Sequence, residues 1–123
     1  MNKKTFGADP VAPLSDIVVA GGLAYTSGQI GFDDEMNLIE GGIEEQTHAT
    51  FKNLKNVLAK AGLSLEDVLR CGCYLVNRED LASFNKIYAE YFTGDKPARS
   101  TIFISSLPVE GSIVEIDAVA AAK

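Results

Sequence analysis

The sequence has little of the chemistry that many enzymes use to bind metals or form covalent intermediates. Its 123 residues include no tryptophan, one histidine and two cysteines. A zinc site takes three or four ligands of the Cys, His or carboxylate type, so this supply argues against one. The single histidine, His48, lies among polar residues of a predicted helix, which disfavours a Ser–His–acid triad. Phosphate-binding glycine motifs are also missing, and we expect no cofactor and no metal.

Long apolar runs are absent as well. No segment approaches the roughly 20 consecutive apolar residues that a membrane-spanning helix needs. Residues 1–7 contain two lysines, but no apolar segment follows them as it would in a signal peptide. The sequence therefore predicts a cytoplasmic protein with no membrane partner.

Basic residues are few, with 11 Lys and Arg against 17 Asp and Glu and a formal net charge of −6. Only Lys3 and Lys4 are adjacent. Nucleic-acid binding depends largely on neutralising phosphates with Lys and Arg, so we expect no nucleic-acid partner. A single basic residue could still bind one small carboxylate.

Length and composition predict one globular domain spanning residues 1–123. Hydrophobic residues make up 46% of the chain and charged residues 23%. A domain of this size buries roughly two-thirds of its unfolded surface, so it can fold without disulfides or metal. Cys71 and Cys73 lie on one face of a predicted strand, and we expect them to pack as small buried residues.

Several short segments have the composition of β-strands. Residues 17–20 and 23–27 flank Gly21-Gly22, a two-residue hairpin signal. Further strands are predicted at residues 68–76, 100–105 and 112–121.

Two stretches show the three- and four-residue spacing of amphipathic helices. The first runs from Ile43 to Ala61 and is stopped by Gly62. The second is capped by Asn77 or Asp80 and has an apolar stripe formed by Leu81, Phe84, Tyr88, Tyr91 and Phe92. The order is roughly β-β-β-α-β-α-β-β, which favours an α+β sheet with both helices on one face. The other face would be partly apolar, and an oligomer would cover it.

Two stretches near the C-terminus could carry chemistry. Arg99 follows Pro97 at the start of a predicted strand, where its guanidinium could bind a carboxylate through two N–H donors. An ordinary surface salt bridge is the alternative. On the last strand, alternation places Glu115 and Asp117 on the same face. A buried carboxylate pair needs a partner or a role, so Arg99 could pair with it, or the pair could face solvent.

These segments together resemble the RidA (YjgF) family, over nearly the whole chain. Residues 26–30 are similar to the family's TSGQI motif, and residues 80–92 to its second helix. The C-terminal signature of the family resembles three segments here, Pro97-Ala98-Arg99-Ser100, Leu107-Pro108 and Glu115-Ile116-Asp117. Several motifs in the same order are more specific than any one alone.

The resemblance implies a chorismate-mutase-like α+β fold, with a mixed β-sheet of about six strands and two helices on one face. It also implies a homotrimer around a central barrel-like core, with a cleft between each pair of neighbouring subunits.

The resemblance further implies a 2-iminobutanoate/2-iminopropanoate deaminase. Such enzymes hydrolyse reactive enamines and imines, such as 2-aminoacrylate, to a 2-keto acid and ammonia without a cofactor. By resemblance, Arg99 binds the substrate carboxylate and Glu115 orients or activates water. Backbone amides near Gly28 and Thr101 help to hold the ligand, and Asn85 lies close by.

The chain departs from the family pattern at two positions. Leu14 stands where well-studied deaminases have a tyrosine, and its side chain cannot hydrogen-bond to substrate or water. Thr101 replaces a residue that is often cysteine, although a backbone contact there would survive the change. The alternative function is therefore a non-catalytic protein that binds a small 2-keto or amino acid. RNA cleavage, described for some family members, is disfavoured by the acidic charge and the lack of a histidine pair.

Overall fold

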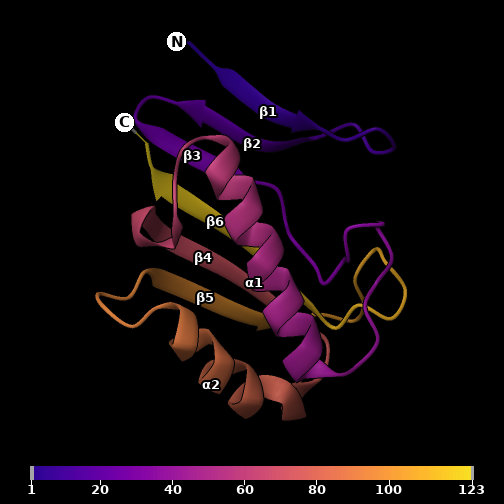
Figure 1. Ribbon diagram of the computed structural model, residues 1–123. Helices are drawn as coiled ribbons and strands as arrows, with labels where there is room; N and C mark the ends of the chain where they lie inside the picture. Colours follow the sequence, from indigo (N-terminus) through magenta and orange to yellow (C-terminus); the bar gives the residue numbers. More distant parts are fainter. Residues whose placement is uncertain (1, 123) are drawn as a thin grey trace.

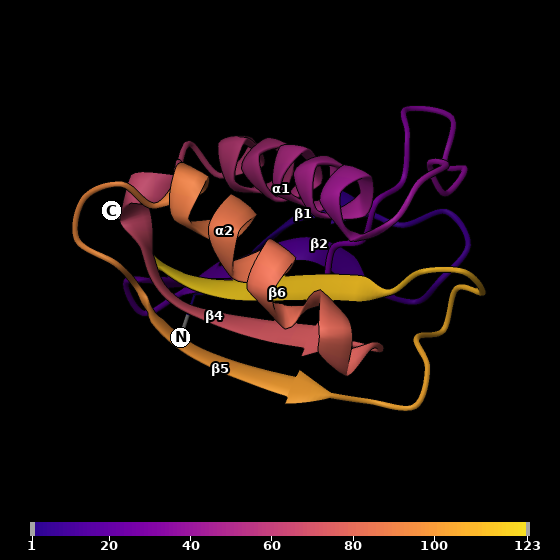
Figure 2. The same ribbon diagram turned by 90° about the horizontal axis from the view of Figure 1, so that it is seen from below.

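The computed structural model describes residues 2–122 as a six-stranded sheet with two helices on one face (Figures 1 and 2). The order of the strands across the sheet is β1-β2-β3-β6-β4-β5. The strands are β1 (Lys4–Ala8), β2 (Ser15–Ala20), β3 (Leu23–Thr26), β4 (Val68–Leu75), β5 (Ala98–Phe103) and β6 (Val114–Ala121). The helices are α1 (Ile43–Lys60) and α2 (Leu81–Tyr91), each near a short 3-10 turn at Leu65–Asp67 or Arg78–Asp80. Strands β4 and β5 are parallel and the other neighbours antiparallel, which confirms the mixed sheet.

The predicted order of elements is confirmed, and the structure locates the one N-terminal strand for which no range was predicted. Gly21 and Gly22 both have positive φ, 61° and 78°, as a two-residue hairpin between twisted strands requires. The first strand is Lys4–Ala8, which the sequence patterns did not identify and which pairs with β2. After β3, Gln29 forms an isolated β-bridge with Ile116.

The helices begin and end close to the predicted positions. Helix α1 stops at Lys60, and Gly62 follows with a φ of 74°, the left-handed conformation that ends many helices. Helix α2 follows Asp80, but neither Asp80 nor Asn77 caps it with a side-chain hydrogen bond to the backbone. Within residues 2–122, no helix is long and apolar enough to cross a membrane.

The core lies between the two helices and the sheet. Helix α1 contributes Phe51, Leu54 and Leu58, all fully buried, and α2 contributes Phe84. The strands contribute, among others, Ile17, Cys71, Cys73, Leu75, Val114 and Ile116, each at 0% exposure. The prediction that both cysteines are buried is therefore confirmed.

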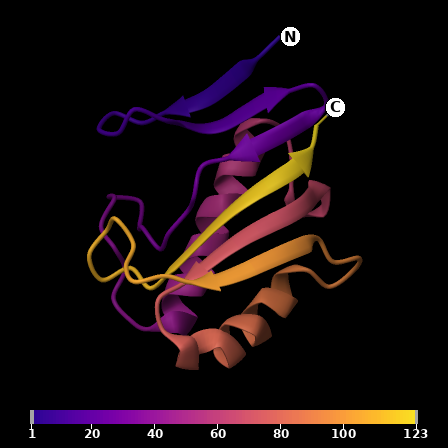
Figure 3. The ribbon, with the colours of Figure 1, turned by 180° about the vertical axis from the view of Figure 1, so that it is seen from behind.

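The opposite face of the sheet has no helix over it in the described chain (Figure 3). Tyr25 and Ile102 project from this open face, with 47% and 48% of their surface exposed. Val18 and Val119 are cross-strand neighbours of Tyr25 and extend the apolar area. The partly apolar face predicted from the sequence is thus present.

Candidate active site

The predicted site residues form two groups, and the first surrounds Arg99. Strand β5 is an edge strand on which Arg99, Thr101 and Phe103 alternate toward the helix side of the sheet. The Nη2 atom of Arg99 donates a 2.7 Å hydrogen bond to Oδ1 of Asn85 on α2. Arg99, Asn85 and Thr101 are called the Arg99 group below.

Arg99 has no acidic partner within residues 2–122, where the salt bridges are Lys52–Asp34 and Lys60–Asp16. Its guanidinium is held by a neutral amide and remains partly exposed. Among residues 2–122, Arg99 therefore does not form the ordinary surface salt bridge that was the predicted alternative. A guanidinium has five N–H donors, so a fixed arginine with one neutral partner retains donors for a carboxylate.

Thr101 and the two cysteines lie beneath α2, on the same side as Arg99. Cys71 pairs with Arg99 across the parallel strands, and Cys73 pairs with Thr101. The Oγ1 atom of Thr101 is buried and has no hydrogen-bond partner among the described residues. Burial raises the pKa of the Cys73 thiol to about 12 and raises the pKa of the Cys71 thiol as well. Both thiols are therefore protonated at neutral pH and are poor nucleophiles.

The second group consists of Gly28 and Glu115 and is called the Glu115 group. Backbone hydrogen bonds between Gln29 and Ile116, 2.8 and 3.0 Å long, fix the segment after β3 against β6. A Cβ atom on Gly28 would lie 2.4 Å from Oε2 of Glu115. Only glycine allows the backbone and this carboxylate to approach so closely.

The carboxyl group of Glu115 is half-buried, and its environment favours the neutral form. Desolvation by burial is the main cause that raises its pKa, and the negative charge of Asp117 adds to the effect. Asp117 accepts a 2.9 Å hydrogen bond from the hydroxyl of Tyr74 on β4. A carboxylate with a raised pKa is a stronger base than an ordinary glutamate, which suits proton transfer from water.

The two groups lie on opposite faces of the sheet within one chain. On β4, Cys71 pairs with Arg99, while Tyr74 pairs with Glu115. Residues three apart on a strand point to opposite faces, and Cys71 is the one beneath the helices. Arg99 therefore does not pair with Glu115 or Asp117 in the same chain, and the acidic pair lies on the open face.

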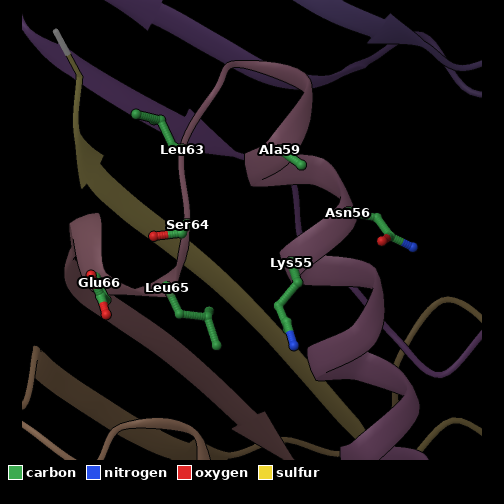
Figure 4. Close-up of a pocket in the computed structure, with 7 residues that line it drawn as sticks. All are labelled: Lys55, Asn56, Ala59, Leu63, Ser64, Leu65 and Glu66. Atoms are coloured by element: carbon green, nitrogen blue, oxygen red, sulfur yellow. The ribbon is translucent and has the colours of Figure 1, made fainter.

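Two surface depressions of the described chain contain no predicted site residue. The larger, about 520 Å³, lies between α1 and the Leu65–Asp67 turn (Figure 4). Its lining residues are Lys55, Asn56, Ala59, Leu63, Ser64, Leu65 and Glu66. The smaller, about 260 Å³, lies beside Phe6 and Val19. Among residues 2–122, no three His, Cys, Asp or Glu side chains are placed to hold one metal ion.

Sequence patterns missed two aromatic contacts of Arg99. Its guanidinium carbon lies 4.7 Å from the ring centroid of Tyr88 and 5.6 Å from that of Phe84. Both rings were assigned to the core stripe of the second helix, which is correct but incomplete. The available signal was the spacing of Phe84, Asn85 and Tyr88, which places all three near one helix face.

Residues 2–122 thus form an α+β fold in which an arginine without an acidic partner among them lies on one face of a mixed sheet and a half-buried glutamate on the other. The sequence model of the family described as Endoribonuclease L-PSP matches residues 6–122. The chain therefore belongs to this family, which is the YjgF/RidA family.

Individual relatives agree with the family assignment. A RutC family protein of Pyrococcus horikoshii is 38% identical over 112 residues, covering 90% of this chain and 88% of the relative. The Rid-family protein YyfA of Yersinia pestis has a crystal structure that is similar with a TM-score of 0.92 and 34% identity, covering 98% of this chain and 100% of that one. Escherichia coli TdcF, crystallised with bound serine, is similar with a TM-score of 0.85 and 27% identity, covering 92% of this chain and 91% of that one.

Proposed function

We propose that the protein hydrolyses reactive enamines and imines that carry a carboxylate, such as 2-aminoacrylate and 2-iminopropanoate, to a 2-keto acid and ammonia. The observation that carries this proposal is the Arg99 guanidinium, which Asn85 holds in place and no acidic side chain of residues 2–122 neutralises. A fixed, unpaired arginine suits a small carboxylate, and the chain belongs to a family in which some members are deaminases.

The proposed reaction needs little beyond positioning and one base. The enamine first takes up a proton at its terminal carbon and becomes an iminium, whose carbon is electrophilic. Water attacks this carbon while Glu115 accepts the water proton, which gives a carbinolamine. Glu115 then passes this proton to the nitrogen. The C–N bond breaks while the carbinolamine hydroxyl gives its proton back to Glu115, so that the C=O bond of the 2-keto acid forms and ammonia leaves. Arg99 contributes by holding the carboxylate, which fixes the carbon relative to the water.

We further propose that each site is completed by a second copy of the chain. The Arg99 group and the Glu115 group lie on opposite faces of one sheet, so one substrate cannot contact both groups of the same chain. We propose that an oligomer covers the open face and places the Glu115 group of one subunit next to the Arg99 group of its neighbour. The proposed assembly is a homotrimer with a central barrel-like core and three such sites. The cytoplasmic location and the lack of a nucleic-acid partner remain predictions.

The decisive assay measures pyruvate formation from 2-aminoacrylate. A serine dehydratase generates 2-aminoacrylate, semicarbazide traps the imine that is not hydrolysed, and pyruvate is followed as this protein is added. We expect faster pyruvate formation, and we expect Arg99→Ala to abolish the increase. Arg78→Ala is the matched control, because Arg78 also stacks on an aromatic ring, Phe103, outside the proposed site. No acceleration at protein levels that match the substrate flux would rule out 2-aminoacrylate as the substrate.

A non-catalytic binding protein is the second candidate, and Leu14 favours it. Leu14 precedes β2 and is 42% exposed, with no group that can hydrogen-bond to substrate or water through its side chain. Binding of a 2-keto or amino acid that depends on Arg99, without turnover of any imine, would identify this function.

A further inference from the structure

We propose that Tyr88 is the positioning residue for Arg99, and that the face of its ring holds the guanidinium in the orientation that binds the substrate carboxylate. This inference rests on the proposed function. The Arg99 guanidinium carbon lies 4.7 Å from the Tyr88 ring centroid, within the range of a cation–π contact. Asn85 holds one edge of the same guanidinium through a 2.7 Å hydrogen bond.

The Tyr88 ring is itself fixed on its other sides. It makes aromatic contacts with Phe51, Phe84 and Phe92, at centroid distances of 5.7, 5.7 and 4.9 Å. Only 6% of the residue is exposed. A ring packed in this way cannot follow a mobile arginine side chain, so it confines the guanidinium.

The hydroxyl group of Tyr88 does not account for its position next to Arg99. Its buried oxygen has no nitrogen or oxygen hydrogen-bond partner among residues 2–122 and lies next to the Cys71 thiol. Burial and the neighbouring Cys71 thiol raise the pKa of this phenol, so it is neutral at physiological pH. The interaction with Arg99 is therefore made by the ring face and not by a phenolate charge.

The contact matters because no acidic side chain among residues 2–122 pairs with Arg99. A carboxylate neighbour would hold the guanidinium but would also occupy the donors and compete with the substrate. The ring and the Asn85 amide restrain the side chain without neutralising its charge. Loss of the ring would release arginine rotamers, which substrate binding would then have to restrict at a cost in affinity.

The test varies the ring electrostatics without changing its shape. Phenylalanine, 4-fluorophenylalanine and 3,4,5-trifluorophenylalanine are introduced at position 88, because fluorine progressively weakens the negative ring face. We expect Tyr88→Phe to behave like the wild-type protein and the trifluoro variant to raise KM by roughly three- to thirtyfold, the range of a lost cation–π contact. The value of kcat should change little, and the dissociation constant for pyruvate should rise in parallel with KM. Tyr88→Leu should give the same result if it folds.

The matched control is the same fluorinated series at Phe103. This ring lies under Arg78 at 4.6 Å, on the same strand as Arg99 but outside the proposed site. Fluorination at 103 should leave KM and pyruvate binding unchanged. If KM stays unchanged across the series at position 88, or rises equally in the series at position 103, Tyr88 is not the positioning residue for Arg99. A wild-type protein that neither binds pyruvate nor accelerates its formation would instead refute the proposed function, and the inference with it.

Discussion

Arg99 on β5 and Glu115 on β6 lie on opposite faces of the same sheet, and strand β4 lies between these two strands. A substrate that contacts both residues therefore has to bind between two chains. This arrangement makes the oligomer part of the proposed chemistry, and it leads to a test that does not depend on a structure of the assembly.

Two inactive variants should complement each other. Arg99→Ala and Glu115→Gln should each lose most activity. The first variant lacks the residue that binds the substrate carboxylate, and the second lacks the base. When the two are unfolded, mixed in equal amounts and refolded together, random trimers should regain about a quarter of the wild-type sites. The measurement is pyruvate formation by the mixture.

The control for complementation is a mixture of each variant refolded with itself. It should stay inactive. If the co-refolded mixture forms oligomers of both variants, shown by mass spectrometry, and still has no activity, then the site does not combine Arg99 and Glu115 from different chains.

Gly28→Ala should reduce activity more than stability. The new methyl group would overlap Oε2 of Glu115, at 2.4 Å, and the carboxylate has to move away from its position. Because the carboxylate is the end of a flexible side chain, the fold should tolerate the change. A displaced base should lower kcat/KM by roughly ten- to a hundredfold. Steady-state kinetics and thermal unfolding measure the two effects.

Gly94→Ala is the matched control, because a Cβ atom at position 94 would meet nothing within 4 Å. It should leave both kcat/KM and the unfolding temperature close to wild-type values. Wild-type kinetics for Gly28→Ala would show that the close approach of Gly28 and Glu115 has no role in activity.

The pH dependence of kcat/KM should report the ionisation of Glu115. The base form is needed, so kcat/KM should fall as the pH drops through the pKa of this carboxyl. That pKa is raised by burial and by Asp117, and the fall should begin at a higher pH than for an ordinary glutamate. Asp117→Asn removes the neighbouring charge but not the burial. The fall of kcat/KM on the acidic side of the pH profile should therefore move to lower pH in this variant, but not as far as for an exposed carboxyl.

Asp34→Asn is the control for the pH experiment, because it removes a charge from an exposed loop where Asp34 faces Lys52. Its profile should match that of the wild-type protein. An acidic limb that does not move in Asp117→Asn would mean that a group other than Glu115 controls the rate.

The sequence predicted those parts of the fold and site that depend on local patterns. The Gly21-Gly22 hairpin, the two helices and the shared face of Glu115 and Asp117 follow from turn chemistry and from periods of 3.6 and 2 residues. Strand β1 was not identified, because its KTFGA segment contains Gly7 and only a weak alternation. Its pairing with β2 depends on contacts that local propensity does not describe.

The relation between the two groups could not be read from the sequence for a different reason. Alternation shows which residues of one strand share a face. It does not show which residues of two different strands lie on the same face of the sheet. Arg99 was therefore a possible partner of Glu115 until the register of both strands with β4 was known. The role of Tyr88 was also hidden, because a core aromatic and an aromatic under an arginine have the same helical spacing.

Leu14→Tyr should distinguish a deaminase from a binding protein. Leu14 lies next to Ser15, whose backbone oxygen accepts a 2.6 Å hydrogen bond from the Ser27 hydroxyl, beside Gly28. We expect a tyrosine at position 14 to place a hydroxyl where it can hydrogen-bond to substrate or water, because the adjacent Ser15 is tied to the residue before Gly28. If the protein is a deaminase, we expect a severalfold rise in kcat for 2-aminoacrylate, within the range of one added hydrogen bond. Leu14→Phe supplies the ring without the hydroxyl and should not raise kcat. If wild-type protein binds pyruvate through Arg99 and neither variant turns over 2-aminoacrylate, the binding function is favoured, because the missing hydroxyl then does not explain the lack of turnover.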